Sequence, residues 1–309
     1  MMNWLRNIWK NRVWLLMVLP ATVWFVLFSY LPMAGTVIAF KNFRYDAGGF
    51  FSSVMSSEWV GLENFEFLFN SSDAFIITRN TLLYNLVFIV VGLIISVTIA
   101  ILISEIANKR LAKIYQTGML FPHFLSWVVV SYFVFTFLSA DRGMVNSLIE
   151  WLGGDPISWY NDPEYWPYIL TFTNLWKTVG YGSIIYIAAI VGIDRSYYEA
   201  AMIDGASKLQ QIKNITIPMI KPLIIVLTIL NIGNIFNSDF GLFFQVPRDS
   251  GPLYDVTNVI DTYVYRGLMN LGEISMSTAA GLYQSLVGFI LVLATNYVVR
   301  KIDKDSALF

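Results

Sequence analysis

The sequence predicts an all-α membrane protein with six membrane-spanning helices. Hydrophobic residues make up 56% of the 309-residue chain and charged residues only 13%, so there are too few polar side chains to cover the surface of soluble domains of this total length. Apolar stretches about 20 residues long, enough to cross the hydrocarbon layer, recur along the chain. Cysteine is absent and histidine occurs once, which excludes disulfides, thiolate chemistry and Cys- or His-rich metal sites. The net charge of −1 gives no indication of a nucleic-acid partner.

The predicted spans follow one another within a single transmembrane domain covering residues 1–309. The first is longer than one crossing and contains Pro20 and Pro32, so we expect a tilted or kinked helix. It lacks a small-residue cleavage pattern and is predicted to be a retained span rather than a secretory signal. The clearest window runs from Leu82 to Ile103 and is interrupted only by Asn85 and a few hydroxyl residues. The predicted spans are residues 13–40, 82–105, 118–138, 168–193, 222–244 and 279–299.

The distribution of Lys and Arg predicts the orientation, because cytoplasmic loops carry an excess of both. Thirteen of the twenty lie in four short regions at the two ends and in alternate connections, which predicts that both termini are cytoplasmic. These thirteen are Arg6, Lys10, Arg12, Lys109, Arg110, Lys113, Arg195, Lys208, Lys213, Lys221, Arg300, Lys301 and Lys304.

Three longer connections, residues 42–78, 139–167 and 246–278, then face outward. They are rich in aromatic residues near the span ends, and we interpret these as an interfacial belt rather than as sugar-stacking surfaces. The aromatic residues concerned are Trp59, Trp151, Trp159, Tyr160, Tyr165 and Trp166.

The chemistry of an autonomous pump is missing from the sequence. No phosphate-binding GxxxxGK[ST] loop occurs, so the chain is not expected to hydrolyse ATP alone. Only Lys177 and Asp239 lie well inside spans, which is too few for a proton relay. An ion pair between these two residues is a further hypothesis. His123, which follows Pro122, is interpreted as a structural residue at a helix break.

The loop between the fourth and fifth spans, residues 194–218, carries the most specific signal. Ser196 stands three residues before Glu199, a capping-box spacing that predicts a short helix ending at Ile203. Gly205 is expected to turn the chain. Ser207 then begins a second short helix that Pro218 is expected to end.

The first of these helices resembles a docking element more than a lipid-lying helix. Ala200 and Ala201 allow close approach of another backbone, and Tyr197, Tyr198 and Met202 are residue types enriched at interfaces. A helix on the lipid surface would carry a basic face and a large apolar face. Neither face is present, so we favour docking onto another protein.

Glu199-Ala-Ala, Gly205 and the Ile215-x-Ile-Pro218 group stand at the spacing of the EAA loop. The chain therefore resembles permease subunits of binding-protein-dependent ABC importers. Ile217 stands where that family commonly has Leu. The resemblance implies that the loop docks into a groove of a separate ATPase subunit and transmits its motion. The residues implied in this coupling are Glu199, Ala200, Ala201, Asp204, Gly205, Ile215 and Pro218.

Further segments are similar to the polysaccharide-type, LplB-like branch of the family. They include Phe121-Pro-His-Phe-Leu-Ser-Trp and Asp261-Thr-Tyr-Val-Tyr, and only the stretch 238–242 departs clearly from the pattern. The resemblance implies a type I, MetI-like importer permease in a bacterial cytoplasmic membrane. It implies a second related permease, two ATPase subunits that hold ATP and Mg, and an extracellular or lipid-anchored sugar-binding protein. The chain itself is expected to bind no cofactor and to be no enzyme.

A path for a sugar needs hydrogen-bonding groups inside the membrane. Asn231, Asn234 and Ser238 have a spacing that places them on one face of a helix. A second set lies on the fourth span. Such groups either line the path or bond to a neighbouring permease, and the sequence leaves both readings open. The candidate path residues are Asn174, Trp176, Lys177, Tyr181, Asn231, Asn234, Asn237, Ser238 and Asp239.

Two other functions compete with an oligosaccharide permease. An ion-coupled secondary carrier would work without an ATPase, but the docking elbow and the scarcity of buried charges disfavour it. An ABC permease for an amino acid or peptide would share the loop, and only the resemblance outside the loop disfavours it.

Overall fold

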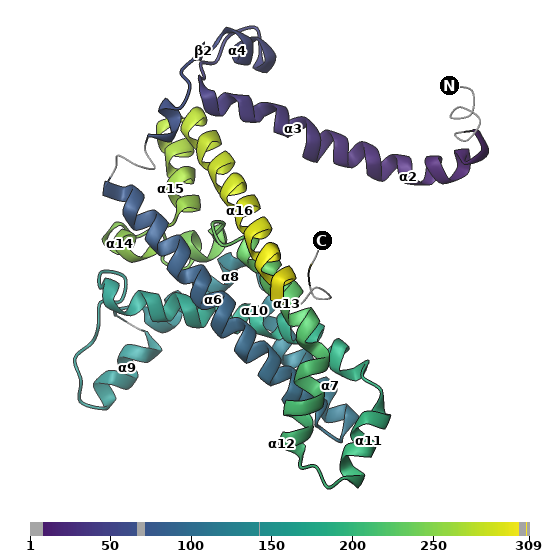
Figure 1. Cartoon of the computed structure of the whole chain (residues 1–309). Helices are drawn as coiled ribbons and strands as arrows, with labels where there is room; N and C mark the ends of the chain where they lie inside the picture. Colours follow the sequence, from purple (N-terminus) through teal and green to yellow (C-terminus); the bar gives the residue numbers. More distant parts are fainter. Residues whose placement is uncertain (1–8, 67–71, 142, 303–306, 308–309) are drawn as a thin grey trace. The chain divides into compact units, whose positions relative to one another are not determined.

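The computed structural model describes residues 9–66, 72–141, 143–302 and 307 (Figure 1). Almost all of the regular structure in these residues is helical, with one two-stranded antiparallel ladder that pairs β1, Lys41–Asn42, with β2, Glu58–Trp59. The prediction of an all-α membrane protein is confirmed. Four described helices are long and apolar enough to cross a membrane, and two bent helix pairs would bring the number to six. The four are Arg12–Phe40, Asp73–Ser104, Lys208–Gly233 and Ile274–Lys301.

The chain divides into two compact units. The first comprises Met1–Phe69 with Gly267–Leu282, and the second comprises Asn70–Arg266 with Tyr283–Phe309. In the first unit, α2 (Arg12–Phe25) continues through a π-helical turn, η1 (Val26–Tyr30), into α3 (Leu31–Met33) and η2 (Ala34–Phe40). The helix thus passes both Pro20 and Pro32. The wider turn between them relieves the carbonyl clash that a proline causes inside a regular α-helix.

The rest of the first unit is short and polar. It holds α4 (Phe50–Ser56), η3 (Glu63–Phe65), η9 (Gly267–Leu271) and the start of α16 (Ile274–Ile302). The Nζ atom of Lys41 donates to the carbonyl oxygens of Val54 and Ser57, which ties β1 to α4.

Two helices packed along each other form the centre of the second unit. They are α6 (Ser72–Ser104) and α10 (Trp166–Val191), and both run through the middle of the unit in Figure 1. Small residues permit this approach. A Cβ atom added at Gly182 would lie only 2.9 Å from the Ser96 hydroxyl oxygen. Ala100, Tyr186, Ile187 and neighbouring aliphatic side chains fill one buried cluster on these helices.

The predicted third span is bent rather than straight. Helix α7 (Lys109–Leu120) and η4 (Phe121–Phe124) meet α8 (Trp127–Leu138) at 97°. The bend has a local cause. Pro122 tightens the chain into a 3₁₀ turn, Leu125 is extended, and the Ser126 side chain then caps α8 by accepting a hydrogen bond from the Val129 amide.

The connections of the second unit that are predicted to face outward contain short helices around a second core. They are α9 (Met144–Trp151), η5 (Pro163–Tyr165), η7 (Gly241–Gln245), η8 (Gly251–Leu253), α14 (Tyr254–Thr257) and α15 (Ile260–Arg266). The assignment of Trp159 and Trp166 to an interfacial belt is wrong, because both are buried. The Trp166 indole donates to the Trp159 carbonyl at 2.6 Å, and the Trp159 indole donates to the Asn146 side chain at 2.8 Å. These internal bonds satisfy their polar atoms, so neither indole needs the membrane interface.

Candidate functional site: a coupling elbow and an amide-lined cavity

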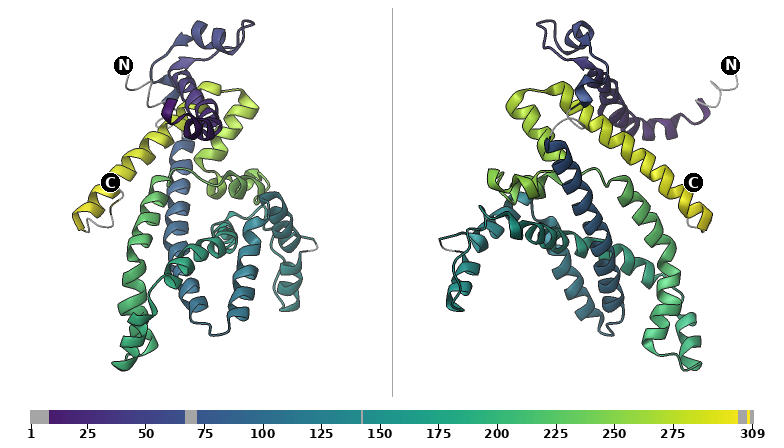
Figure 2. Two further views of the ribbon diagram at one scale, coloured as in Figure 1. Left: turned by 90° about the vertical axis from the view of Figure 1, so that its right-hand side faces the viewer. Right: turned by 60° about the vertical axis from the view of Figure 1, so that its left-hand side comes forward.

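The predicted helix, turn, helix elbow is present. Helix α11 (Arg195–Ile203) and α12 (Lys208–Gln211) are joined at Gly205, whose φ is +77°. In both views of Figure 2 the elbow lies at the end of its unit, beyond the turn between α6 and α7. The capping assignment is corrected, because Asp194 and not Ser196 caps α11. The Asp194 carboxylate accepts the Ser196 amide at 2.9 Å, and this hydrogen bond holds the pKa of Asp194 below its ordinary value.

The second half of the elbow begins as expected and ends differently. Ser207 and Gln210 form a capping box. Pro218, however, does not end the helix: α12 continues through the π-helical η6 (Ile212–Thr216) into α13 (Ile217–Gly233). The Ile217 amide bonds to the carbonyl of Ile212, and this wider turn makes room for the proline ring one residue later. The elbow is therefore the direct extension of a candidate membrane span.

Two contacts fix the elbow to its unit. The hydroxyls of Tyr198 and Thr216 are hydrogen-bonded at 2.9 Å, which links α11 to η6. Lys208 forms an ion pair with Glu105 at 2.9 Å, next to the end of α6. Apart from these contacts α11 lies on the surface, and none of its nine residues is buried.

The coupling residues are arranged accordingly. Glu199, Ala200, Asp204 and Gly205 are exposed and Ala201 is half-buried. Farther along, Ile215 is half-buried in η6 and Pro218 is exposed at the start of α13. Large apolar side chains lie beside them, with 87% of Ile203 and 54% of Met202 exposed. An exposed helix with such side chains has the character of a docking surface.

Most of the predicted path residues line one cavity of about 400 Å³ in the second unit. They come from α10 and from the end of α13, and α6 forms the remaining wall. The path residues in this cavity are Asn174, Tyr181, Asn231, Asn234 and Asn237. No charged side chain lines it, so the cavity offers amide and hydroxyl groups next to apolar surface.

Three of these amides have no partner within the described part of the chain. The side chains of Asn174, Asn231 and Asn237 make no hydrogen bond there, whereas the Asn234 amide donates to the Leu230 carbonyl at 3.0 Å. Amides engaged in packing this chain would be bonded to one another or to its backbone. The free amides are therefore available to a molecule or a partner that enters the cavity.

The geometry predicted for the fifth span is wrong. Asn231, Asn234 and Ser238 do not share a helical face, because α13 ends at Gly233 and residues 234–239 are not helical. Asn85, projecting from α6, donates to the carbonyls of Ile235 and Asn237 at 2.9 and 3.2 Å. These bonds satisfy carbonyls that the ended helix leaves free. The broken segment still brings Asn237 into the cavity.

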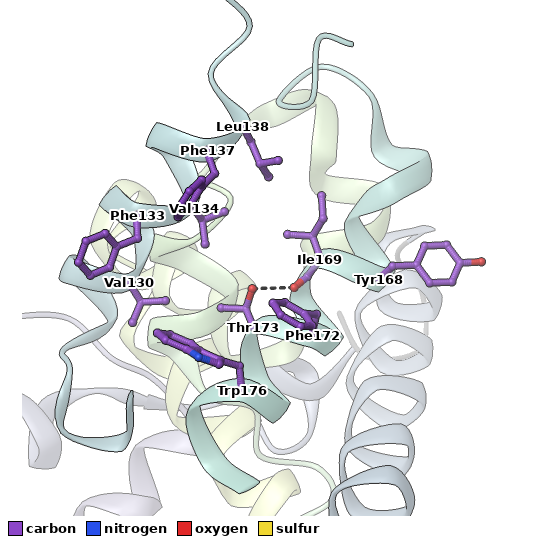
Figure 3. Close-up of a pocket in the computed structure, with 10 residues that line it drawn as sticks. All are labelled: Val130, Phe133, Val134, Phe137, Leu138, Tyr168, Ile169, Phe172, Thr173 and Trp176. Carbon is purple, nitrogen blue, oxygen red and sulfur yellow. Dashed lines mark hydrogen bonds between the residues drawn. The ribbon is translucent and has the colours of Figure 1, made fainter. Parts of the chain in front are cut away.

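The remaining path candidates lie elsewhere. Trp176 lines a separate apolar cavity of about 570 Å³ between α8 and α10, where Figure 3 shows it near Phe172 and Thr173. The Ser238 hydroxyl accepts a hydrogen bond from the Asn85 side chain at 3.4 Å, and the Ser238 backbone amide donates to the Asp261 carboxylate at 2.8 Å. Asp239 caps η7 through the amides of Gly241 and Leu242.

The proposed ion pair between Lys177 and Asp239 is absent from the described structure. Lys177 donates to the His123 carbonyl at 2.8 Å, and Asp239 accepts the Trp127 indole N–H at 2.8 Å. The Lys177 ammonium lies 5.1 Å from the centre of the same Trp127 ring. Trp127 thus stands between the two charges. His123 lies at the helix break, as predicted, and its ring stacks on Tyr181 at 4.4 Å.

Four further polar residues of the amide-lined cavity were not predicted from the sequence. They are Asn85 and Ser96, which interrupt the apolar window 82–103, and Thr178 and Thr228. Their positions on α6, α10 and α13 become a common site only when the packing of the three helices is known. A polar residue inside an otherwise apolar span is the signal that would have selected Asn85.

The sequence matches the family described as "Binding-protein-dependent transport system inner membrane component" over residues 89–304. The chain belongs to this family. It is a membrane component of a transport system and not an enzyme. Among curated relatives, it is 34% identical to the protein LplB of Bacillus subtilis over 304 residues, which are 98% of this chain and 93% of that protein. It is 36% identical over 291 residues, 94% of this chain and 88% of the relative, to the polygalacturonan/rhamnogalacturonan transport permease YteP of the same species.

The fold agrees with this assignment. A chain in the crystal structure of a bacterial ABC transporter that imports the acidic polysaccharide alginate superposes with a TM-score of 0.87 and 33% sequence identity. The match covers 98% of this chain and all of that chain. In the alginate transporter bound to its pentasaccharide-loaded periplasmic protein, the corresponding match has a TM-score of 0.86, 33% identity and coverage of 97% and 98%.

Proposed function

We propose that this permease forms half of the translocation path of an ATP-driven importer for an oligosaccharide or polysaccharide fragment. An external solute-binding protein delivers the substrate, a second related permease forms the other half of the path, and two ATPase subunits hold ATP and Mg. The substrate class is supported by the relatives that transport polygalacturonan, rhamnogalacturonan or alginate. The complex lies in a bacterial cytoplasmic membrane, with both termini of this chain on the cytoplasmic side.

The amide-lined cavity is the observation that carries the substrate proposal. Sugar hydroxyls are both donors and acceptors, and a side-chain amide offers both functions. Asn174, Asn231 and Asn237 present such amides without hydrogen-bond partners among the described residues. No charged side chain lines this cavity. A carboxylate on the sugar would have to be met elsewhere along the path.

The elbow is the proposed link to the ATPase. Glu199, Ala200, Ala201, Asp204 and Gly205 form or flank its exposed helix. Because α12 leads without a break into α13, a displacement of the elbow would move a span whose far end, at Asn231 and Asn234, lines the cavity. Closure of the ATPase dimer would in this way open the path by a rigid-body shift.

The test is purification of the tagged chain from its native membrane, with mass spectrometry of the chains that copurify. The ATPase activity of the assembly is then measured with binding proteins loaded with candidate glycans. A second permease and an ATPase stimulated by one loaded binding protein would support the proposal. A lone homo-oligomer that takes up solute in ATP-free vesicles would replace it with an ion-coupled carrier. Competition by amino acids or peptides but not by sugars would reassign the substrate.

Uptake by cavity variants tests the path itself. Asn231→Leu keeps the approximate side-chain size and removes the amide, and one lost hydrogen bond corresponds to about a fivefold weaker substrate interaction. Asn270→Leu is the control, because Asn270 is exposed and does not line the cavity. Equal effects of the two substitutions would contradict a path through the amide-lined cavity.

A further inference from the structure

A third cavity, of about 700 Å³, lies beside the elbow. Its walls come from the end of α6, the start of α7, the end of α10 and the first residues of α11 and α12. Four of its lining residues are cations and one is an acid. They are Lys109, Lys113, Arg195, Lys208 and Glu105.

The positive charge of this cavity is not neutralised by the protein. Glu105 forms an ion pair with Lys208 at 2.9 Å. No other ion pair to the lining cations occurs among the described residues. Asp194, the acid next to Arg195, is engaged with the Ser196 amide. Lys109 and Lys113 are four residues apart on α7, where like charges repel. Lys109, Lys113 and Arg195 therefore line the cavity without an ion-pair partner among the described residues, which favours an anionic ligand.

The positions of two cations strengthen this inference. Lys109 is the first residue of α7 and Arg195 is the first residue of α11. A cation at a helix N-terminus opposes the helix dipole and destabilises the helix slightly. The start of α7, whose cap is the neutral Asn108, adds positive potential to the cavity, whereas the Asp194 carboxylate at the start of α11 offsets part of the potential of that helix and of Arg195. This arrangement is unfavourable for the empty protein and becomes favourable when an anion is present.

The rest of the cavity is aliphatic. Ile103, Ile187, Ile190 and Val191 form the wall that continues from the buried cluster between α6 and α10. A small soluble anion needs only the cations, whereas a molecule with an anionic head and an apolar chain uses both surfaces. The combination of a basic rim and an aliphatic wall at the end of spanning helices selects the second kind of ligand.

We propose that this cavity binds the headgroup of an anionic phospholipid, with the adjoining acyl chain on the aliphatic wall. The assignment of the cavity to the cytoplasmic leaflet rests on the proposed function. Arg195 and Lys208 are the first residues of the two helices of the elbow. A headgroup bound to them therefore ties the elbow to α6 and α7. The lipid thereby stabilises the elbow in one position and makes ATPase coupling dependent on the lipid composition of the membrane.

Lipid retention tests the site directly. The assembly purified with the full chain is reconstituted in nanodiscs of phosphatidylcholine with or without 20% phosphatidylglycerol, and the lipids that stay bound are counted by native mass spectrometry. Lys109→Gln with Lys113→Gln is expected to lower phosphatidylglycerol retention about 25-fold, about fivefold for each cation removed. Arg110→Gln is the matched control, because Arg110 neighbours Lys109 on α7 but does not line the cavity.

Four outcomes would overturn the proposal. The first is no preferential retention of phosphatidylglycerol by the unsubstituted protein, and the second is an equal loss in the Arg110→Gln control. The third is displacement of the lipid when inorganic phosphate is added at millimolar concentration, which would assign the cavity to a soluble anion. Retention that disappears once an ATPase subunit is bound would likewise overturn it, in favour of an acidic segment of that subunit.

The lipid inference and the proposed function fail separately. An assembly without an ATPase that still retains phosphatidylglycerol through Lys109 and Lys113 would contradict the importer and leave the lipid site intact. An assembly with a stimulated ATPase that shows no lipid preference would contradict the lipid site and leave the importer proposal intact. Where both hold, the double variant is expected to lose the dependence of ATPase stimulation on phosphatidylglycerol.

Discussion

The ammonium group of Lys177 donates a hydrogen bond to the backbone carbonyl of His123 at 2.8 Å. His123 lies in η4, just before the 97° bend between α7 and α8, where a carbonyl loses its helical partner. Lys177 is only 8% exposed. A buried cation on the central helix α10 therefore holds the bend in place, with the Trp127 ring beneath it. Lys177 was predicted to line a transport path, but its ammonium group has a structural partner in the His123 carbonyl.

Removing this donor is expected to loosen the bend. Lys177→Met keeps the aliphatic stem and leaves the His123 carbonyl without its partner, which costs about 1–3 kcal/mol. For a chain of this size the melting temperature in detergent should fall by several degrees. Lys221→Met is the control, since Lys221 is exposed. A melting temperature equal to that of the control would show that the contact contributes nothing to stability.

Helices α7 and α10 touch through Gly180. A Cβ atom added at Gly180 would overlap the backbone carbonyl of Met119, which cannot move aside as a side chain can. Gly180→Ala is expected to destabilise the protein by at least 1–3 kcal/mol, the usual cost of overpacking, and to lower its yield in the membrane. Gly118→Ala provides the comparison on α7, directly before Met119, because a Cβ there meets no atom within 4 Å. Similar yields and melting curves for the two variants would rule out the close approach.

The turn of the elbow depends on Gly205. Space is not the constraint, since a Cβ there has no neighbour within 4 Å, but a φ of +77° is unfavourable for other residues. Gly205→Ala should cost about 1–2 kcal/mol and reduce the ATPase stimulation of the purified assembly. Gly205→Asn should be milder, because Asn tolerates the left-handed region. Stimulation that is preserved in the Ala variant and lost in the Asn variant would contradict this explanation.

The cap of α11 should respond to acid. The folded-state pKa of Asp194 lies below its value in the unfolded chain, so the stability that the carboxylate contributes is present above about pH 4 and is lost as the pH falls through the folded-state pKa. The protection of α11 amides from hydrogen exchange, relative to the intrinsic rate at each pH, should therefore fall as Asp194 is protonated. Asp194→Asn retains a capping group that does not titrate. This loss of protection should be missing from that variant, and its persistence there would assign the effect to another group.

Composition and local patterns determined much of this protein. Long apolar stretches with few charges require helices in a membrane, because only a helix or a closed barrel satisfies the backbone there. The turn at Gly205 and the cap at Ser207 were likewise predictable, since both depend on residues close together in the chain. The EAA spacing then indicated the family that the comparisons establish.

Tertiary structure decided what neighbouring residues could not. The end of α13 at Gly233 and the continuation of its other end through Pro218 depend on hydrogen bonds from α6 and on a π-helical turn, and neither has a distinct local pattern. Trp127 separates Lys177 from Asp239, and the free amides of three segments meet in one cavity. The basic cavity likewise requires five helix ends to converge. A sequence specifies which groups a helix carries, whereas the partners of those groups follow from how the helices pack.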